Sequence, residues 1–438
     1  MTDIYSWTLP GYQWTNHSWL YDLILYQLSR HFSFIGLSIA TGFVGLLTFY
    51  FIIQTFKLSY WKKAIAGVIF VLLTEEANHS GFRSQSISLM FFAILMNILI
   101  RSRKNIKWAY TLPPLFLLWA NMHADFSLGL GIAGVFLGMS FLIKTFKTEI
   151  ISRKLMGGYA LPLIIAFAVT FINPFTYNVY LEGFRHISNP YLQNVLEWRP
   201  IFDDCAYCHP DTFVAFSVVV LAISLYFVSK KKYYIIPYII VYLGFIYPTF
   251  NTRRFLPIFC VVLLPPLLEF LEKLKWDFSK LKIALPISIL LIVVGLEVNF
   301  YNRYMGSHLY TYNEYDYCHY AVQCSPKLAN YLVQNPPQGK GFNLYTWGGY
   351  FIGKGVPVKL FVDGRMHVWI QDGYQPFADF IKMYYDLNID MFKKYDFDWV
   401  VVEDNQPIAD KLYSTSEMGN WKLQFSDGNS DYFVRVRN

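Results

Sequence analysis

The chain consists, for most of its length, of apolar runs separated by short clusters of lysine and arginine. Most of these runs approach the ~20 apolar residues that a helix needs to cross a bilayer. Hydrophobic residues make up 55% of the 438 residues and charged residues 15%, against roughly 25% charged in a soluble domain. The pattern predicts a polytopic α-helical membrane protein with about ten transmembrane helices, at 33–56, 64–74, 86–100, 109–120, 126–143, 155–173, 212–229, 233–250, 255–270 and 283–296.

The cationic clusters predict which side of the membrane each connection faces. They begin at Lys57, Arg101, Lys144, Lys230 and Lys273, and they occupy every second connection if all the runs cross. Short loops rich in lysine and arginine remain in the cytoplasm. The N-terminus and the C-terminal domain are therefore expected outside the cytoplasm, and the net charge of +7 reflects membrane topology, not a nucleic-acid partner.

The sequence predicts three parts. Residues 1–32 are expected to be the remnant of a first external loop with an amphipathic helix at the membrane interface, residues 33–300 the helical bundle, and residues 301–438 an extracytoplasmic α/β domain. No signal peptide precedes the first part to carry it outside. We therefore expect the chain to lack a first transmembrane helix; spontaneous translocation of a short, weakly charged tail is the alternative.

Polar residues gather in the connections on the outer side. Ionisable groups near membrane depth usually face a cavity or one another. The sequence therefore predicts an external cavity, and ordinary solvated loops are the alternative for any single residue. Its lining would be Glu75, Glu76, His79, His123 and Asp125, with Arg83, Arg253 and Arg254 beside them.

The C-terminal domain shows short strand and helix patterns. Strands are expected at 341–345, 358–365 and 397–404, helices at 346–355, 376–395 and 407–414, and a hairpin at 421–437. Strands that alternate with helices suggest a partly parallel sheet, where ligands favour the carboxyl ends of strands.

Asp363 and Arg365 follow one predicted strand, separated by a single glycine. Asp363 could accept hydrogen bonds from a sugar or peptide, and Arg365 could bind a phosphate or carboxylate. Alternatively, the two form a structural salt bridge beneath a turn. Trp347, with the two glycines after it, is likewise either a packing residue or a ligand contact.

The cysteines permit two pairings. Cys205 and Cys208 have the spacing of half a zinc site or a redox pair, but without a second pair chance or a local disulfide is favoured. Cys318 and Cys324 could bridge in an oxidising compartment.

Several short motifs occur in an order that resembles one group of bacterial membrane proteins. The order resembles membrane glycosyltransferases of the GT-C superfamily, which includes protein mannosyltransferases and oligosaccharyltransferase. The resemblance implies a bundle of at least eleven helices, a large first external loop and location in the bacterial cytoplasmic (inner) membrane. The motifs are WTNHSWL, FRSQS, LWANMHADFSLGL, FINPFTY, EWRP, RRFLP, YTWGGYFI and VDGR.

The resemblance also implies a reaction. A sugar would pass, with inversion, from a polyprenyl-phosphate donor to a glycan or protein acceptor outside the cytoplasm, with Mg or Mn as an optional cofactor. The acidic residues expected in the first external loop are absent, and Asp3 and Asp22 are poor substitutes on position alone. The donor phosphate would bind Arg83, Arg253 and Arg254, and the acceptor Trp347, Asp363 and Arg365.

Two other functions remain open. One is a non-catalytic membrane protein whose external domain binds a partner. The other is a transporter for lipid-linked sugars, which paired broken helices in two matching halves would favour.

Overall fold

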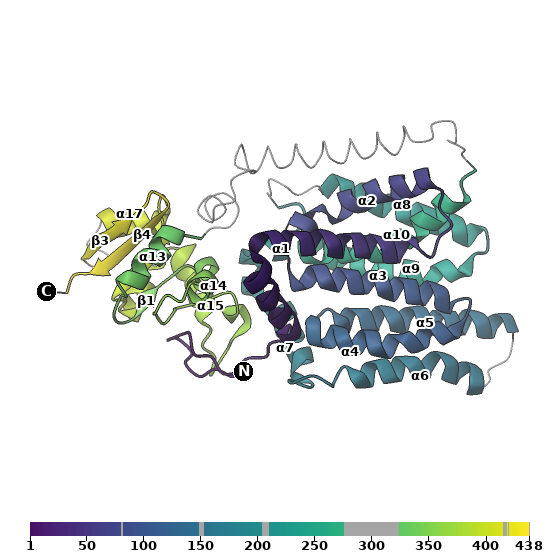
Figure 1. The fold of residues 1–438 in the computed structure, drawn as a ribbon, viewed down its shortest axis with the longest axis horizontal. Coiled ribbons are helices and arrows are strands. Elements are labelled where there is room, and N and C mark those ends of the chain that lie inside the picture. The colour runs from purple at the N-terminus through teal and green to yellow at the C-terminus, as the bar shows by residue number, and fades with distance from the viewer. Residues whose placement is uncertain are drawn as a thin grey trace. The chain divides into compact units, whose positions relative to one another are not determined.

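The computed structural model describes residues 1–79, 82–148, 153–203, 210–275, 324–414, 418 and 420–437. The chain forms two compact units, each described here by itself (Figure 1). The helical unit comprises Asn16–Gly183 and Leu196–Val298. The sheet unit comprises Met1–Thr15, Phe184–Val195 and Asn299–Asn438, the last described from Cys324 onward.

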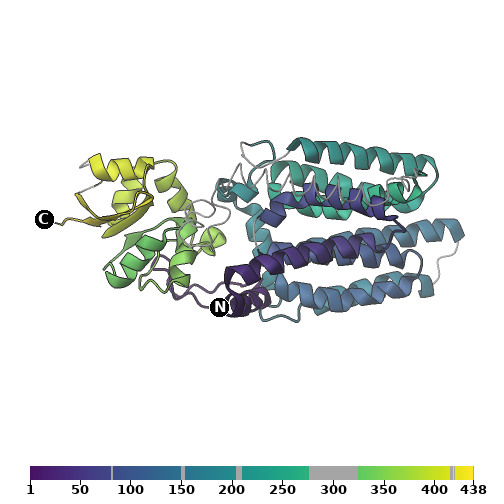
Figure 2. The ribbon, with the colours of Figure 1, turned by 45° about the horizontal axis from the view of Figure 1, so that its top comes forward.

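The predicted apolar runs form the helices of the helical unit wherever they fall in the described residues. The run at 283–296 lies outside those residues. Figures 1 and 2 show the helices side by side in a bundle. They are α1 (Trp19–Ile53), α2 (Tyr60–His79), α3 (Ser84–Ser102), α4 (Leu112–Met122), α5 (Phe126–Thr148), α6 (Arg153–Val169), α8 (Pro210–Ser229), α9 (Ile236–Asn251) and α10 (Leu256–Lys273), with α7 (Asn178–Ser188) beginning after α6.

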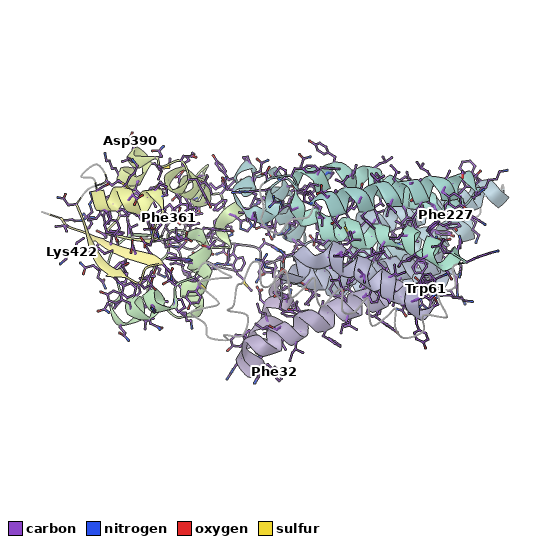
Figure 3. All side chains as sticks on the ribbon, turned by 90° about the horizontal axis from the view of Figure 1, so that it is seen from above. Phe32, Trp61, Phe227, Phe361, Asp390 and Lys422 are labelled. Atoms are coloured by element: carbon purple, nitrogen blue, oxygen red, sulfur yellow. The ribbon has the colours of Figure 1, made fainter. Side chains whose placement is uncertain are left out.

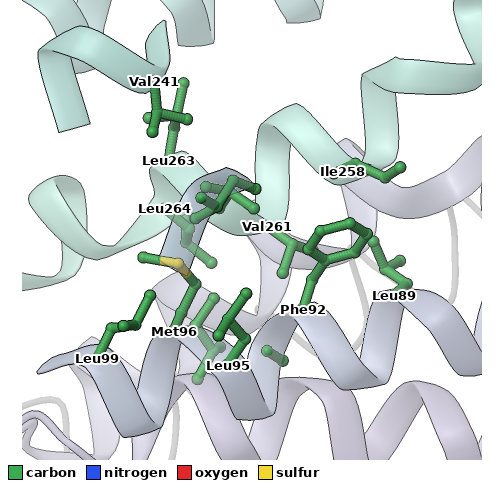
Figure 4. Packing of buried hydrophobic residues seen from close by; sticks show 14 of the residues in the cluster. Leu89, Phe92, Leu95, Met96, Leu99, Val241, Ile258, Val261, Leu263 and Leu264 are labelled. Atoms are coloured by element: carbon green, nitrogen blue, oxygen red, sulfur yellow. The ribbon is translucent and has the colours of Figure 1, made fainter. Parts of the chain in front are cut away.

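The helices α3 and α10 form the centre of the bundle. Their apolar stretches are 72% and 67% buried, whereas the stretch Gly36–Ile53 of α1 is 17% buried. Phe92 and Met96 of α3 pack against Val261 and Leu264 of α10 (Figure 4). The peripheral helices thus expose apolar side chains, as expected for surfaces in contact with lipid.

Among the described residues, six helices are long and apolar enough to cross a membrane, rather than the predicted ten. The difference has a physical cause. The helix α4 has 11 residues, α6 has an apolar part of only Gly157–Val169, and α2 ends in the polar sequence TEEANH. The count of six rests on length and composition alone.

The predicted interfacial helix and the first predicted span form one continuous helix, α1, of 35 residues. This helix bends, and Phe32 lies at the bend (Figure 3). A Cβ added to Gly36 would lie 2.1 Å from the Cβ of Phe32. The bend therefore requires glycine at position 36.

The sheet unit contains a four-stranded sheet in the order β1-β2-β4-β3. Only β1 and β2 are parallel; the other pairs are antiparallel. The strands are β1 (Gly341–Phe342), β2 (Trp399–Glu403), β3 (Trp421–Ser426) and β4 (Ser430–Arg435), and the helices are α13 (Pro326–Gln334), α14 (Tyr345–Gly353), α15 (Pro376–Tyr384), α16 (Ile389–Tyr395) and α17 (Pro407–Ser414).

Two predicted elements of this unit are wrong. The segment 358–365 is not a strand of the sheet, because Leu360 instead makes a single parallel bridge to Ser6 near the N-terminus. The predicted helix at 376–395 is two helices, α15 and α16, separated where Leu387 takes a φ of 51°. That left-handed conformation cannot continue a helix.

The first fifteen residues are an integral part of the sheet unit. The indole nitrogen of Trp7 donates to the Gly341 carbonyl at 3.1 Å, and the Thr8 hydroxyl donates to the Phe361 carbonyl at 2.8 Å. The sequence-based division kept residues 1–32 together, but the structure divides them between Thr15 and Asn16.

Candidate functional site

Three charged side chains from distant parts of the chain meet in the helical unit. Arg83 precedes α3, Glu197 lies in the 3-10 helix η3 (Leu196–Trp198), and Arg254 lies in η5 (Arg253–Phe255), before α10. One oxygen of Glu197 accepts from Arg83 Nη1 at 3.1 Å, and the other accepts from Arg254 Nη1 at 2.9 Å. We call these three residues the arginine bridge.

The arginine bridge carries two positive charges and one negative charge. The Arg83 side chain is half exposed, whereas Arg254 is largely covered and lies 5.1 Å from the ring centre of Trp198. The Gln85 amide oxygen, oriented to satisfy both groups, accepts from Arg254 at 3.0 Å. Two guanidinium groups with one shared carboxylate suit the recognition of a further anion.

His123 and Asp125 form a polar pair between α4 and α5. His123 is buried, and its Nδ1 lies 3.0 Å from Asp125 Oδ2. Burial raises the pKa of Asp125, but His123, Arg254 and Ser88 outweigh this effect and lower the pKa to about 2. Asp125 is thus held as a carboxylate, and it is a weak proton acceptor near neutral pH.

Arg253 does not join the arginine bridge. Its side chain is buried, with Nε donating to the Pro200 carbonyl at 3.0 Å and Nη2 to the Asp203 carbonyl at 2.6 Å. Its backbone N–H also donates to the Arg199 carbonyl at 3.0 Å. This geometry makes Arg253 a clamp on residues 199–203, so two adjacent arginines serve different purposes.

Asp22 lies in the first turn of α1, directly after Tyr21. Asn16 donates to its carboxylate at 2.7 Å, and the hydroxyl of Tyr21 donates to the Phe82 carbonyl at 2.6 Å, one residue before Arg83. Solvent reaches Asp22, yet partial desolvation raises its pKa above the usual range despite the Asn16 hydrogen bond. Sequence reasoning discounted Asp22 on its position alone, because neither its hydrogen bond from Asn16 nor its environment is visible in the sequence.

A second charged cluster, the Arg365 centre, consists of Arg365, Asp363 and Asp3 in the sheet unit. Arg365 donates to Asp363 through Nε at 2.8 Å and Nη2 at 2.6 Å, and to Asp3 through Nη2 at 2.9 Å. The Asp3 and Asp363 side chains are 0% and 1% exposed, and the Arg365 side chain is 23% exposed. Aromatic rings surround the guanidinium at 5.2 to 5.4 Å, from Tyr5, Trp14 and Trp369.

The Arg365 centre has the geometry of the structural alternative, a salt bridge that holds a turn. Burial raises the pKa of Asp3, but hydrogen bonds from Ser6 and Tyr5 and the charge of Arg365 lower it below its usual value. The guanidinium and the two carboxylates of the Arg365 centre already pair with one another. An acceptor would have to displace these contacts to reach Asp363 or Arg365.

Trp347 lies on α14 and is buried. The next residue, Gly348, would place an added Cβ 2.6 Å from both the Asp363 Cβ and the Val362 carbonyl oxygen. Gly348 therefore allows a close approach between α14 and the segment that carries Asp363.

The remaining predicted site residues cannot be placed. The side chains of Glu75, Glu76 and His79 lie outside the described residues, as do Cys205, Cys208 and Cys318. Cys324 is in a disulfide. Within the described ranges, no group of three or more His, Cys, Asp or Glu could hold a metal ion.

Comparison with known proteins adds no relative: no family model matches the chain, and no curated protein matches it. The long apolar helices indicate an integral membrane protein, mostly helical, with a small sheet-containing region near its C-terminus.

Proposed function

We propose that the protein is a GT-C type glycosyltransferase that moves a sugar from a polyprenyl-phosphate donor to an acceptor outside the cytoplasm. In this proposal the chain crosses a bacterial cytoplasmic membrane ten times, with both termini outside. The observation that supports it most directly is the arginine bridge, where two arginines share one carboxylate.

The donor phosphate binds at the arginine bridge. A phosphate oxygen takes the place of one Glu197 oxygen, and the planar guanidinium of Arg254 offers two parallel N–H donors. The exposed Arg83 moves to complete the contact, while Trp198 and Gln85 keep Arg254 in place. Arg253 has no part in this step because its side chain is buried, with Nε and Nη2 donating to main-chain carbonyls.

Asp22 is the proposed general base of the transfer. Its raised pKa makes it a better proton acceptor than an ordinary aspartate, and no ion pair to a described cation neutralises it. Glu197 and Asp3 are each held by an arginine, and Asp125 is paired with His123. Asp22 therefore takes the proton of the acceptor hydroxyl while the hydroxyl oxygen attacks the sugar carbon and the donor phosphate leaves.

Trp347, Asp363 and Arg365 stabilise the sheet unit from within, instead of touching the acceptor. No step is derived through Mg or Mn, because the described residues offer no ligand group for either metal.

Donor binding tests the phosphate site. Arg254→Ala in the full-length protein in nanodiscs should lose most binding of polyprenyl phosphate, by roughly tenfold or more for a lost charge-assisted pair. Native mass spectrometry measures the bound lipid. Lys422→Ala removes an equal charge from an exposed strand position and should bind like the wild type. Equal binding by Arg254→Ala and Lys422→Ala would refute the site.

Turnover separates the transferase from its alternatives. Asp22→Asn should keep donor binding and lose sugar transfer, measured with a lipid-linked radiolabelled sugar and extracted envelope acceptors. A wild-type protein that binds the lipid, moves it across a vesicle and transfers no sugar would be a transporter. One that binds no lipid would favour the partner-binding alternative.

A further inference from the structure

The helix α7 is amphipathic, but its apolar face is exposed and its polar face is covered. This is the reverse of a surface helix in a soluble protein. The side chains that point away from the protein are Tyr177 just before the helix, then Leu181, Phe184 and Ile187, exposed by 59, 44, 68 and 69%. Their spacing of four, three and three residues places them on one face. Water alone would not favour so much apolar surface on a helix of 11 residues.

The opposite face of α7 is the covered one, and it carries polar groups. Val179 and Glu182 are buried, at 2% and 5% exposed, and His186 is half-buried on the same side. The Nε2 atom of His186 lies 2.8 Å from Nε2 of His367. The protein therefore satisfies the polar face of α7 and leaves the apolar face uncovered.

The apolar face of α7 follows, along the chain, a helix that also exposes apolar side chains. The helix α6, directly before it, exposes Ile164 by 61% and Phe167 by 49%, and Ile172 in the connection is 63% exposed. Arg185 lies at the flank of the apolar face, where a long cation can extend to anionic headgroups. Continuity and charge both favour a lipid surface over a protein partner.

From these observations we infer that α7 lies in the outer interface of the bilayer, with Tyr177, Leu181, Phe184 and Ile187 in the acyl boundary region. An amphipathic helix of this kind binds the membrane without crossing it. Glu197 of the arginine bridge follows in the same connection, nine residues after Ser188. The connection that contains Glu197 is thus anchored to the membrane by α7. This holds whether or not the protein is a transferase.

A photoactivatable lipid tests this inference. The full-length protein in nanodiscs of phosphatidylcholine and phosphatidylglycerol is labelled with a diazirine acyl-chain lipid, and labelled peptides are mapped by mass spectrometry. Label is expected in 177–188 as well as in α6. The control helix α17 buries its apolar residues Ile408 and Leu412 and should remain unlabelled.

A triple variant completes the test. Leu181→Gln, Phe184→Gln and Ile187→Gln together should remove the label from α7 and leave the label on α6 and the thermal stability in detergent unchanged, because these side chains are exposed and do not belong to the described hydrophobic core. Absence of label from wild-type α7 while α6 is labelled would overturn the inference. So would a cross-linked dimer through α7 that excludes the lipid.

Discussion

The arginine bridge and the Arg365 centre contain guanidinium and carboxylate groups in opposite ratios. The arginine bridge has two cations for one carboxylate, and the Arg365 centre has two carboxylates for one cation. In the Arg365 centre the excess negative charge is satisfied, because the backbone N–H groups of Tyr5, Ser6 and Arg365 also donate to the carboxylates. In the arginine bridge, among the described residues, two guanidinium groups share the single carboxylate of Glu197, and Arg83 is half exposed.

The comparison shows how charge balance separates a structural cluster from a binding site. A buried cluster with every group paired holds a fold and gains nothing from a ligand. A partly exposed cluster with unequal charges gains stability when a ligand of the missing charge binds. The predictions below test this contrast, starting with the largest expected effect.

Removing one carboxylate from the Arg365 centre should strongly destabilise the sheet unit. Asp363→Ala leaves Arg365 with Asp3 alone in a largely buried site, and loss of one partner of a buried pair costs about 3 to 5 kcal/mol. Hydrogen exchange of the β2 amides in the full-length protein measures this loss. Asp386→Ala, at an exposed position, should leave the exchange rates unchanged. Equal protection in both variants would mean that the centre is not structural.

The two glycines of α14 provide a matched pair of variants. A Cβ at Gly348 meets the Val362 carbonyl oxygen at 2.6 Å, so Gly348→Ala should separate α14 from Asp363 and cost about 2 kcal/mol. At Gly349 nothing lies within 4 Å, so Gly349→Ala should stabilise the helix by up to about 1 kcal/mol. Thermal unfolding followed by tryptophan fluorescence compares them. The same melting temperature in both variants would contradict the close approach.

Two aspartates of the helical unit should respond to pH with opposite signs. The pKa of Asp125 is lowered to about 2, so its stabilisation is present above pH ~4, its unfolded value, and is lost as the pH falls toward 2. Asp125→Asn should therefore reduce, by about 2 kcal/mol, the free energy of unfolding that the protein loses on acidification. Chemical denaturation between pH 2 and 6 measures the slope.

The pKa of Asp22 is raised, so the folded state favours its protonated form. Its contribution is fully present below the unfolded pKa and is lost as the pH rises through the folded pKa. Asp22→Asn should accordingly leave the protein slightly more stable than the wild type at neutral pH. If Asp22→Asn and Asp125→Asn change the pH dependence of the free energy of unfolding in the same direction, the opposite pKa shifts assigned to the two aspartates are wrong.

The sequence predicted elements well where the signal is local. The apolar runs identified the bundle helices, the buried-strand pattern of residues 397–404 identified β2, and the turn near Asp427 identified the hairpin β3–β4. Prediction from the sequence failed where a segment pairs with a residue far away in the chain. The segment 358–365 has the composition of a strand, but its partner is Ser6, and no local pattern reveals that pairing.

The candidate site shows the same limit. Charge type and position singled out Arg83 and Arg254, but Glu197, which joins them across 114 and 57 residues, carried no signal of its own. Arg253 and Arg254 are adjacent residues of the same type, so the sequence alone does not distinguish their roles. Their different roles depend on which side of η5 meets the carbonyls of residues 200 and 203.

The construction of the sheet unit from three chain segments sets a parity rule for the membrane. Trp7 donates to Gly341, and Asn189 donates to the His367 carbonyl, so all three segments fold on the same side. A chain that leaves one side and returns to it crosses an even number of times. Among the described residues between Thr15 and Phe184, three helices are long and apolar enough to span, an odd number. We infer that an odd number of the remaining helices α2, α4 and α6 also crosses, although length and composition alone would not assign them that role.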